Sequence, residues 1–260
     1  MTLKSIDVDM SLYPEEFHAL MRNAKLYDYS FSAAARVILI DKDGGYFLKS
    51  APKGKLEQQA KMTRYFHSKG LTAEMLAYLS DEQDWLLTEK VRGDNGISKK
   101  YLEQPKRLCD IFAERLAILH GMDYAGCPVE NHTELFLTSA EYGRRNGCFD
   151  KEISKEFGYE TAEQAWDVVC KHIHLLRNDT LLHGDYCLPN IMLDNWRFSG
   201  FVDLDTAGVG DRHVDLFWGT WTLCYNLKTH QYYDRFLDAY GRSRVDEDML
   251  RIIAAAEVFG

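Results

Sequence analysis

The chain has 260 residues, of which 46% are hydrophobic and 27% charged, a composition typical of a folded globular protein and not of a disordered or membrane-embedded one. Lys and Arg number 31 and Asp and Glu number 40, so the formal net charge of -9 disfavours general binding to nucleic-acid phosphates. This charge suits a cationic partner, although acidity can serve solubility alone.

No cysteine pair has the Cys-x-x-Cys spacing, so a zinc ribbon or a thioredoxin motif is not expected. The N-terminal sequence lacks a basic start followed by an apolar run, and no apolar stretch approaches the roughly 20 residues needed to cross a bilayer. We therefore expect a cytoplasmic protein with reduced thiols.

The first third of the chain favours strands. Residues 35–49 predict a hairpin with turn chemistry at 41–45, and residues 84–91 predict a further strand. Between them, residues 55–69 have helical spacing that ends at Gly70. The sequence therefore predicts a small strand-rich lobe at 1–91.

Helices dominate the remaining residues, 92–260. A long amphipathic helix is expected at 102–120. Thr161 and Gln164 form a capping box at the start of another helix. One face of that helix carries Ala165, Val169, His172 and Leu176. Two lobes of this kind predict a ligand site in the cleft between them.

The most informative stretch is residues 181–205, which read LLHGDYCLPNIMLDNWRFSGFVDLD. Its two apolar runs flank a polar turn and predict a β-hairpin. A turn centred between Trp196 and Arg197 places Asn190 opposite Asp203, and Asp185 lies on the loop that enters the hairpin.

One amide oxygen and two carboxylates at one rim suit Mg²⁺, which takes its other ligands from phosphates and water. Asp185 is then free to act on an incoming hydroxyl. Taken alone, His183-Gly184-Asp185 indicates nothing more than a turn. Its combination with Asn190 and a strand-borne Asp203 favours a functional site.

These residues resemble a known family. The segment HGDYCLPNIMLDNWRFSGFVDLDTAGVGDRHVDL is similar to the signature region of the aminoglycoside 3′-phosphotransferases, small kinases with a protein-kinase-like fold. The resemblance extends over nearly the whole chain and includes YFLKS, WLLTEKVRG, LAILHGMDYAGCP and AAAEVFG. It implies an α+β, two-lobed fold with a small antiparallel-sheet N-lobe that binds nucleotide and a larger, mostly helical C-lobe that carries catalysis and substrate binding.

The resemblance also implies roles for single residues. Asp185 matches the catalytic aspartate, which orients the substrate hydroxyl and accepts its proton. Asn190 and Asp203 match the ligands of Mg²⁺. Lys49 matches the lysine that grips the nucleotide phosphates, whereas its strand context alone would indicate an exposed lysine. His183 is expected to hold the loop by hydrogen bonds.

The nucleotide donor, ATP or GTP, is expected against the first lobe. Ser32 falls at the family's nucleotide-covering loop, and Glu89 and Val91 align with the hinge that meets the purine edge. The family pairs its strand lysine with a helix glutamate, but the matching residue here is Gln59. Lys49 then meets a neutral amide, which predicts weaker positioning of the nucleotide.

A second departure is Asp205, which stands where related enzymes carry glycine. If the strand continues, residues 203 and 205 point to the same side. Asp205 then either assists a second metal ion or repels a phosphate, and the sequence leaves both possibilities open.

An aminoglycoside carries several ammonium groups, so its site needs carboxylates near the reacting hydroxyl. The residues that match the substrate region are Asp150, Glu152, Asn226, Glu257 and Phe259. Each acid, taken singly, is equally compatible with a solvated surface. Together they give the net charge of -9 a use, because it attracts a polycation.

The predicted function is therefore phosphoryl transfer from a Mg-nucleotide to an aminoglycoside, at the 3′-hydroxyl in most family members, with antibiotic resistance as the consequence. One alternative keeps the fold but changes the acceptor to choline, a macrolide or another small alcohol. A second alternative is a nucleotide-binding module without turnover, which only Gln59 favours.

Overall fold

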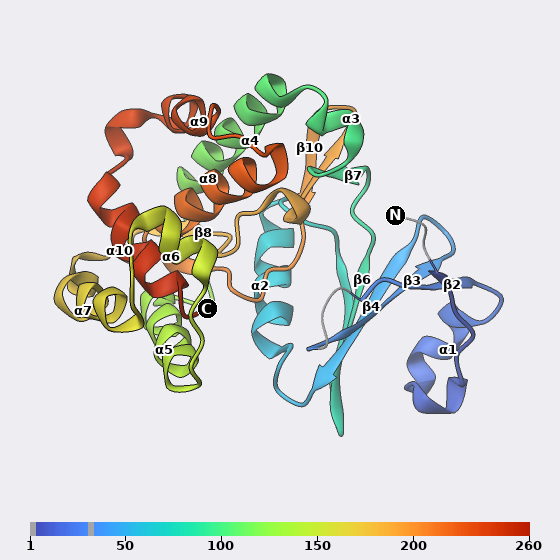
Figure 1. Cartoon of the computed structure of the whole chain (residues 1–260). Coiled ribbons are helices and arrows are strands. Elements are labelled where there is room, and N and C mark those ends of the chain that lie inside the picture. Colours follow the sequence, from blue (N-terminus) through green and yellow to red (C-terminus); the bar gives the residue numbers. More distant parts are fainter. Residues whose placement is uncertain (1–3, 31–33) are drawn as a thin grey trace. The chain divides into compact units, whose positions relative to one another are not determined.

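The computed structural model of the chain describes residues 4–30 and 34–260 (Figure 1). The chain divides into two compact units. Unit 1 comprises Met1–Arg92 and Ser199–Asp205, and unit 2 comprises Gly93–Phe198 and Thr206–Gly260. The first boundary lies one residue from the predicted one, at 91. The prediction of one continuous second lobe overlooked segment 199–205, which packs with unit 1.

Unit 1 is built on a six-stranded antiparallel sheet with the order β1-β2-β3-β4-β6-β5. The predicted hairpin at 35–49 is confirmed as β3 and β4. The turn between them suits its sequence, because Asp43, Gly44 and Gly45 all have positive φ. The strands are β1 (Lys4–Ser5), β2 (Lys25–Asp28), β3 (Arg36–Asp41), β4 (Tyr46–Pro52), β5 (Met75–Ser80) and β6 (Gln83–Glu89).

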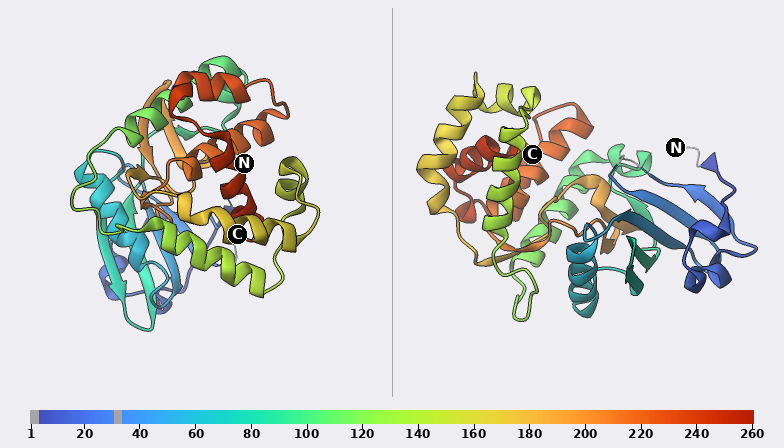
Figure 2. Two further views of the ribbon diagram at one scale, coloured as in Figure 1. Left: turned by 90° about the vertical axis from the view of Figure 1, so that its left-hand side faces the viewer. Right: turned by 90° about the horizontal axis from the view of Figure 1, so that it is seen from below.

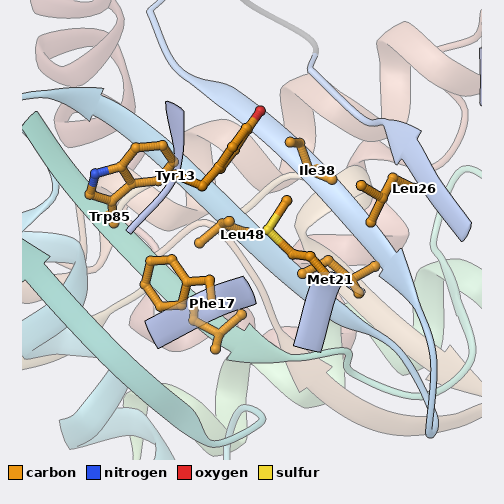
Figure 3. Close-up of a cluster of buried hydrophobic side chains, with 9 residues drawn as sticks. Tyr13, Phe17, Met21, Leu26, Ile38, Leu48 and Trp85 are labelled. Atoms are coloured by element: carbon orange, nitrogen blue, oxygen red, sulfur yellow. The ribbon is translucent and has the colours of Figure 1, made fainter. Parts of the chain in front are cut away.

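Two helices cover opposite faces of this sheet (Figure 1). Figure 3 shows one face, where Phe17 and Met21 of α1 (Glu15–Met21) pack with Leu48 and Trp85. On the other face, Ala60 of α2 (Glu57–Ser68) belongs to a separate apolar cluster. Successive side chains of a strand alternate between the faces, so the residue after Leu48 faces α2. A short 3-10 helix, η1 (Met10–Leu12), precedes α1.

Helix α2 matches the helix predicted at 55–69. The chain leaves it through Gly70, whose φ of 69° is the left-handed conformation that favours glycine at a helix end. Gln59, Met62 and Phe66 are all buried on one face of the helix, as the 3.6-residue period requires.

Unit 2 is mostly helical. The helix predicted at 102–120 is confirmed as α4 (Pro105–His120), which begins three residues later than predicted, and a separate short helix, α3 (Lys99–Leu102), precedes it. Pro105 explains the break, because proline lacks an N–H and is suited to the first turn of a helix. The other helices are α5 (His132–Arg145), α6 (Lys151–Phe157), α7 (Ala162–His172), η2 (Ile173–Leu175), η3 (Leu188–Asn190), α8 (His213–Leu227), α9 (Tyr233–Tyr240), η4 (Arg242–Arg244) and α10 (Glu247–Glu257).

Helix α7 begins where its capping sequence predicts. Thr161 Oγ1 accepts a hydrogen bond from the Gln164 main-chain N–H at 3.2 Å. Ala165 and Val169 are buried, but His172 is exposed. The predicted face therefore ends one turn early, because α7 itself ends at His172 and a 3-10 turn follows.

The hairpin of the informative stretch differs from the predicted one by a residue. Strand β9 (Ile191–Asp194) ends and β10 (Arg197–Phe201) begins around Asn195 and Trp196, both at positive φ. The turn is thus centred between those two residues, so the predicted pairing of residues 190 and 203 is wrong. Asp203 is not on a strand, because β10 ends two residues before it.

Small sheets complete the fold. Strand β9 lies between β10 and β7 (Asp94–Asn95), and β8 (Thr180–Leu182) pairs with β11 (Gly208–Gly210). Within unit 2, helix α10, red in Figure 2, packs on α5, α6, α7 and α8. Within the described ranges, the chain contains no helix with the length and apolar character that spanning a membrane requires.

Candidate active site

Asp185 and Asn190 form the first element of the candidate site, in unit 2. The Asn190 side-chain amide donates to Asp185 Oδ2 at 2.7 Å and to the Asp185 carbonyl at 3.0 Å. Asn190 is buried, whereas Asp185 is partly exposed. Because both hydrogen bonds use the amide nitrogen, the Asn190 amide oxygen is left as an acceptor.

A buried carboxylate, that of Asp215, anchors the loop that carries Asp185. Asp215 Oδ2 accepts the His183 main-chain N–H at 2.8 Å, and Asp215 Oδ1 accepts the Gly184 N–H at 2.8 Å. Gly184 has a φ of 86°, and a Cβ there would collide with the Thr206 carbonyl. The loop therefore needs glycine at this position.

His183 is fully buried. Its ring nitrogen Nδ1 accepts the Asp185 main-chain N–H at 3.3 Å, which suits the expected role in holding the loop.

Lys49 and Asp203 form the second element, in unit 1. The Lys49 ammonium donates to Asp203 Oδ1 at 3.0 Å. The lysine side chain is 18% exposed and the aspartate side chain is 55% exposed. Asp203 has a φ of 54°, a strained left-handed conformation for a residue other than glycine.

Gln59 also lies against Asp203. Its side-chain amide donates to Asp203 Oδ1 at 3.5 Å, and its carbonyl oxygen Oε1 is buried with no hydrogen-bond partner in the part of the chain that the structure describes. The expected contact between Lys49 and Gln59 is therefore not formed, because both groups donate to the same carboxylate oxygen. Glu57 faces away from this group and pairs with Lys61 at 2.6 Å, as predicted.

Asp205 does not continue a strand, so the predicted alignment of its side chain with that of Asp203 is wrong. Its carbonyl accepts a hydrogen bond from the Gln58 side chain at 2.6 Å.

The other nucleotide candidates lie on or near β6. Glu89 is the last residue of β6 and its main-chain N–H donates to the Glu74 carbonyl at 2.9 Å. Val91 is buried. Ser32 lies outside the described residues.

The acids of the predicted substrate region have different environments. Asp150 caps the N-terminus of α6, because its Oδ1 accepts the N–H groups of Glu152 and Ile153 at 2.8 Å. Its own N–H donates to the Val258 carbonyl at 2.7 Å, which joins α6 to the C-terminal segment. The Glu152 side chain is exposed.

Glu257 is the most unusual of these acids. It is buried, and Trp218 Nε1–H donates to its Oε1 at 2.8 Å. Burial raises the pKa of Glu257 to about 8, with a further upward contribution from the negative charge of Asp185, while the Trp218 hydrogen bond opposes the shift. A carboxyl group with this pKa is protonated and neutral at pH 7.

Phe259 lies in the core, where its ring contacts Trp166 and Phe149. Its carbonyl occupies the space that a Cβ on Gly143 of α5 would need. Phe259 can therefore reach a substrate only through its main chain. Asn226 on α8 donates to the Thr222 carbonyl and hydroxyl, which leaves its amide oxygen available.

Two residues that support the loop were not among the sequence candidates. Asp215 is a carboxylate flanked by Val214 and Leu216 near the start of α8, and a buried charge requires donors, so this pattern could have indicated it. His120 donates to it from α4, at the end of the LAILHG segment. Only the fold brings these two residues together, since 95 positions separate them.

The donor set fits Mg²⁺ in its chemistry. The Asn190 amide oxygen and the second Asp203 oxygen, Oδ2, are hard oxygen ligands with no hydrogen-bond donor assigned in the described part of the chain. Asn190 belongs to unit 2 and Asp203 to unit 1. The predicted convergence of Asp185, Asn190 and Asp203 on one metal ion therefore stays a prediction.

Comparison with known proteins places the chain in a family. The family model described as "Phosphotransferase enzyme family" matches residues 30–252. The chain belongs to the phosphotransferase enzyme family. The resemblance to the aminoglycoside 3′-phosphotransferases is confirmed by a relative from Lactococcus lactis, described as "Probable aminoglycoside 3'-phosphotransferase". It is 49% identical over 259 residues, which cover 99% of each chain.

Solved structures of this family have the same fold. An aminoglycoside-3′-phosphotransferase of type VIII superposes with a TM-score of 0.76 at 21% identity, over 96% of each chain. The aminoglycoside phosphotransferase APH(3'')-Id from Streptomyces rimosus, in complex with ADP and streptomycin, also has a TM-score of 0.76, at 18% identity over 97% of this chain and 99% of that chain. The expected α+β, kinase-like fold is thereby confirmed.

Proposed function

We propose that this phosphotransferase transfers the γ-phosphate of ATP or GTP to an aminoglycoside antibiotic, at its 3′-hydroxyl, and so confers resistance. The observation that carries the proposal is the 49% identity to an aminoglycoside 3′-phosphotransferase relative over the full length of both chains. The bonded pair of Asp185 and Asn190 supports the same chemistry, since it fixes a partly exposed carboxylate in one orientation.

In the proposed reaction the drug hydroxyl oxygen attacks the γ-phosphorus. A new O–P bond forms, the bond between the γ-phosphorus and the bridging oxygen of the β-phosphate breaks, and the nucleoside diphosphate leaves. Asp185 accepts the hydroxyl proton. The hydrogen bond from Asn190 and the anchored loop hold the carboxylate still, so the protein contributes mainly orientation and charge.

Asn190 and Asp203 would hold Mg²⁺ through their carboxamide and carboxylate oxygens. Bound there, the ion would neutralise the charge of the nucleotide phosphates. Lys49 would donate to the α- and β-phosphates. Ser32, Gln59, Glu89 and Val91 complete the proposed nucleotide site. The ADP in the Streptomyces rimosus relative is that protein's ligand, and it supports a nucleotide as the donor here.

The aminoglycoside would bind through its ammonium groups. The proposed substrate residues are Asp150, Glu152, Asn226, Glu257 and the main chain of Phe259. An ammonium group bound beside the buried Glu257 would lower its raised pKa and so favour the ionised carboxylate as its partner. The net charge of -9 would draw a polycation toward the protein before any contact forms. We place the reaction in the cytoplasm, because a nucleoside triphosphate donor is available there.

The test uses purified protein and its Asp185→Ala variant in an assay that couples nucleoside diphosphate release to absorbance. We expect diphosphate release that depends on Mg²⁺ and on kanamycin or neomycin, and that Asp185→Ala abolishes. A panel with choline and a macrolide detects a different acceptor. Nucleotide binding without turnover on any acceptor would refute the proposal. Growth of a susceptible bacterium on both drugs, with and without the gene, tests resistance separately.

A further inference from the structure

The carboxylate of Asp215 connects the catalytic loop to two residues far from it. Asp215 is fully buried on α8 and accepts three hydrogen bonds. Two come from the main-chain N–H groups of His183 and Gly184, directly before Asp185. The third comes from the His120 ring, whose Nε2 lies 3.1 Å from Asp215 Oδ2. The other His120 nitrogen, Nδ1, lies 2.9 Å from the Tyr240 hydroxyl.

The charges fix the direction of these hydrogen bonds. Burial would raise the pKa of Asp215, but the hydrogen bonds from the His120 ring and the His183 main-chain N–H hold it below its usual value, so the carboxylate is ionised and can only accept. Burial lowers the pKa of His120, which is therefore a neutral imidazole with one ring N–H. That N–H must be on Nε2, because Asp215 accepts from it. Nδ1 is then an acceptor for the Tyr240 hydroxyl.

The Tyr240 hydroxyl is the next link. Burial raises its pKa, which the positive charge of Arg212 opposes, so the hydroxyl keeps its proton. Because His120 Nδ1 carries no proton, the Tyr240 O–H donates to it. The polar chain thus has one direction, from α9 through α4 and α8 to the loop. Every link lies within unit 2.

We propose that Tyr240 and His120 are positioning residues for phosphoryl transfer, which hold Asp185 in place through Asp215. Tyr240 fixes the tautomer of His120, and His120 fixes the rotamer of Asp215. Asp215 spans the two successive N–H groups of a loop whose Gly184 is already in a left-handed conformation. A rotation of the Asp215 carboxylate would release one of these N–H groups and shift the aspartate that follows. The inference rests on the proposed function.

The first test is kinetic. We expect Tyr240→Phe to lower kcat about tenfold, the factor that the loss of one buried hydrogen bond supports, with the KM for nucleotide and for drug within twofold of wild type. His120→Gln should retain most of the kcat, because the glutamine amide can donate to Asp215 from the position of Nε2. His120→Leu should lose much more. The matched control is Tyr101→Phe, which removes a fully buried hydroxyl bonded to the Leu193 carbonyl and should leave kcat unchanged.

A double-mutant cycle tests the order of the chain. If Tyr240 acts only through His120, Tyr240→Phe should lower kcat no further in the His120→Leu background. Equal kcat values for His120→Gln and His120→Leu, or additive losses in the cycle, would overturn the proposal. So would a Tyr240→Phe variant with a lower melting temperature and an unchanged kcat, because that result indicates a structural role alone.

Hydrogen exchange separates this proposal from the proposed function. We expect the amides of residues 183 and 184 to exchange at least several times faster in Tyr240→Phe than in wild type or Tyr101→Phe, and His120→Gln to retain their protection. Unchanged protection in Tyr240→Phe would overturn the positioning role, whatever the substrate. Faster exchange in a protein that phosphorylates no drug would instead refute only the proposed function. If Tyr240→Phe does not fold, the comparison of His120→Gln with His120→Leu decides the matter.

Discussion

Lys49 and Asp203, which are 154 positions apart in the chain, form an ion pair of 3.0 Å within unit 1. This contact occupies the two groups that the proposed reaction needs for phosphate and for metal. The ion pair thus holds both in place before the nucleotide arrives. Binding of Mg²⁺ and phosphate would exchange one set of charged partners for another, which costs little because both groups are partly solvated.

Lys49→Ala should therefore affect nucleotide binding far more than stability. Loss of a charge-assisted contact of about 1.5–3 kcal/mol raises the KM for nucleotide roughly 10- to 100-fold. The free energy of unfolding should fall by less than about 1 kcal/mol, since the pair is partly exposed. Lys61→Ala is the matched control, because it removes an ion pair on α2 that faces away from Asp203. An equal KM effect from Lys61→Ala would contradict the assignment of Lys49.

Gln59→Glu should raise kcat/KM for the nucleotide several-fold. A carboxylate at position 59 competes with Asp203 for the Lys49 ammonium and leaves Asp203 free for a metal ion. The melting temperature should fall, because the new charge is buried. Gln58→Glu is the control, since Gln58 donates to the Asp205 main-chain carbonyl. A kcat/KM for the nucleotide that stays the same or falls would show that glutamine at position 59 does not weaken the positioning of the nucleotide.

Stability should depend on pH through Glu257. Its folded-state pKa of about 8 lies above the ordinary value of 4.5, so the native protein binds a proton that the unfolded chain releases. The bound proton contributes its whole stabilising effect to the free energy of unfolding below about pH 4.5, and this effect is lost as pH rises to about 8. Each unit of pKa difference corresponds to about 1.4 kcal/mol. Thermal melts from pH 5 to 9 should show the decline, and Glu257→Gln should flatten it. Parallel curves for both proteins would disprove the assignment.

Gly143→Ala should destabilise the protein although alanine favours helices. The added Cβ would overlap the Phe259 carbonyl, so α5 and the C-terminal segment must separate at a cost of about 1–3 kcal/mol. The melting temperature should fall by roughly 2–4 °C for each kcal/mol, and the KM for drug should rise. Ser139→Ala, one turn earlier on the exposed side of α5, should change neither quantity. Normal stability of Gly143→Ala would mean that the carbonyl can move freely.

The hairpin of β3 and β4, helix α2 and the two-part organisation could be predicted from sequence because each depends on local periodicity and turn residues. The place of Gln59 on the buried face of α2 also followed from helical spacing, whereas its contact with Asp203 was not predicted. The register of the β9–β10 hairpin could not be predicted in this way. Its turn depends on the positive φ of Asn195 and Trp196, which neither residue type requires. The roles of His120, Asp215 and Tyr240 depend on contacts between three helices, and no local pattern reports such contacts.

The segment Ser199–Asp205 gives unit 1 a discontinuous sequence, and this has a practical consequence for dissecting the protein. Phe201 packs its ring on Phe66, and its main chain bonds both Leu71 and Thr72. A fragment that stops at residue 92 would lack this strand end together with Asp203, and would expose the apolar side of α2. Expression of unit 1 alone should therefore yield insoluble material unless residues 199–205 are spliced back through a short linker.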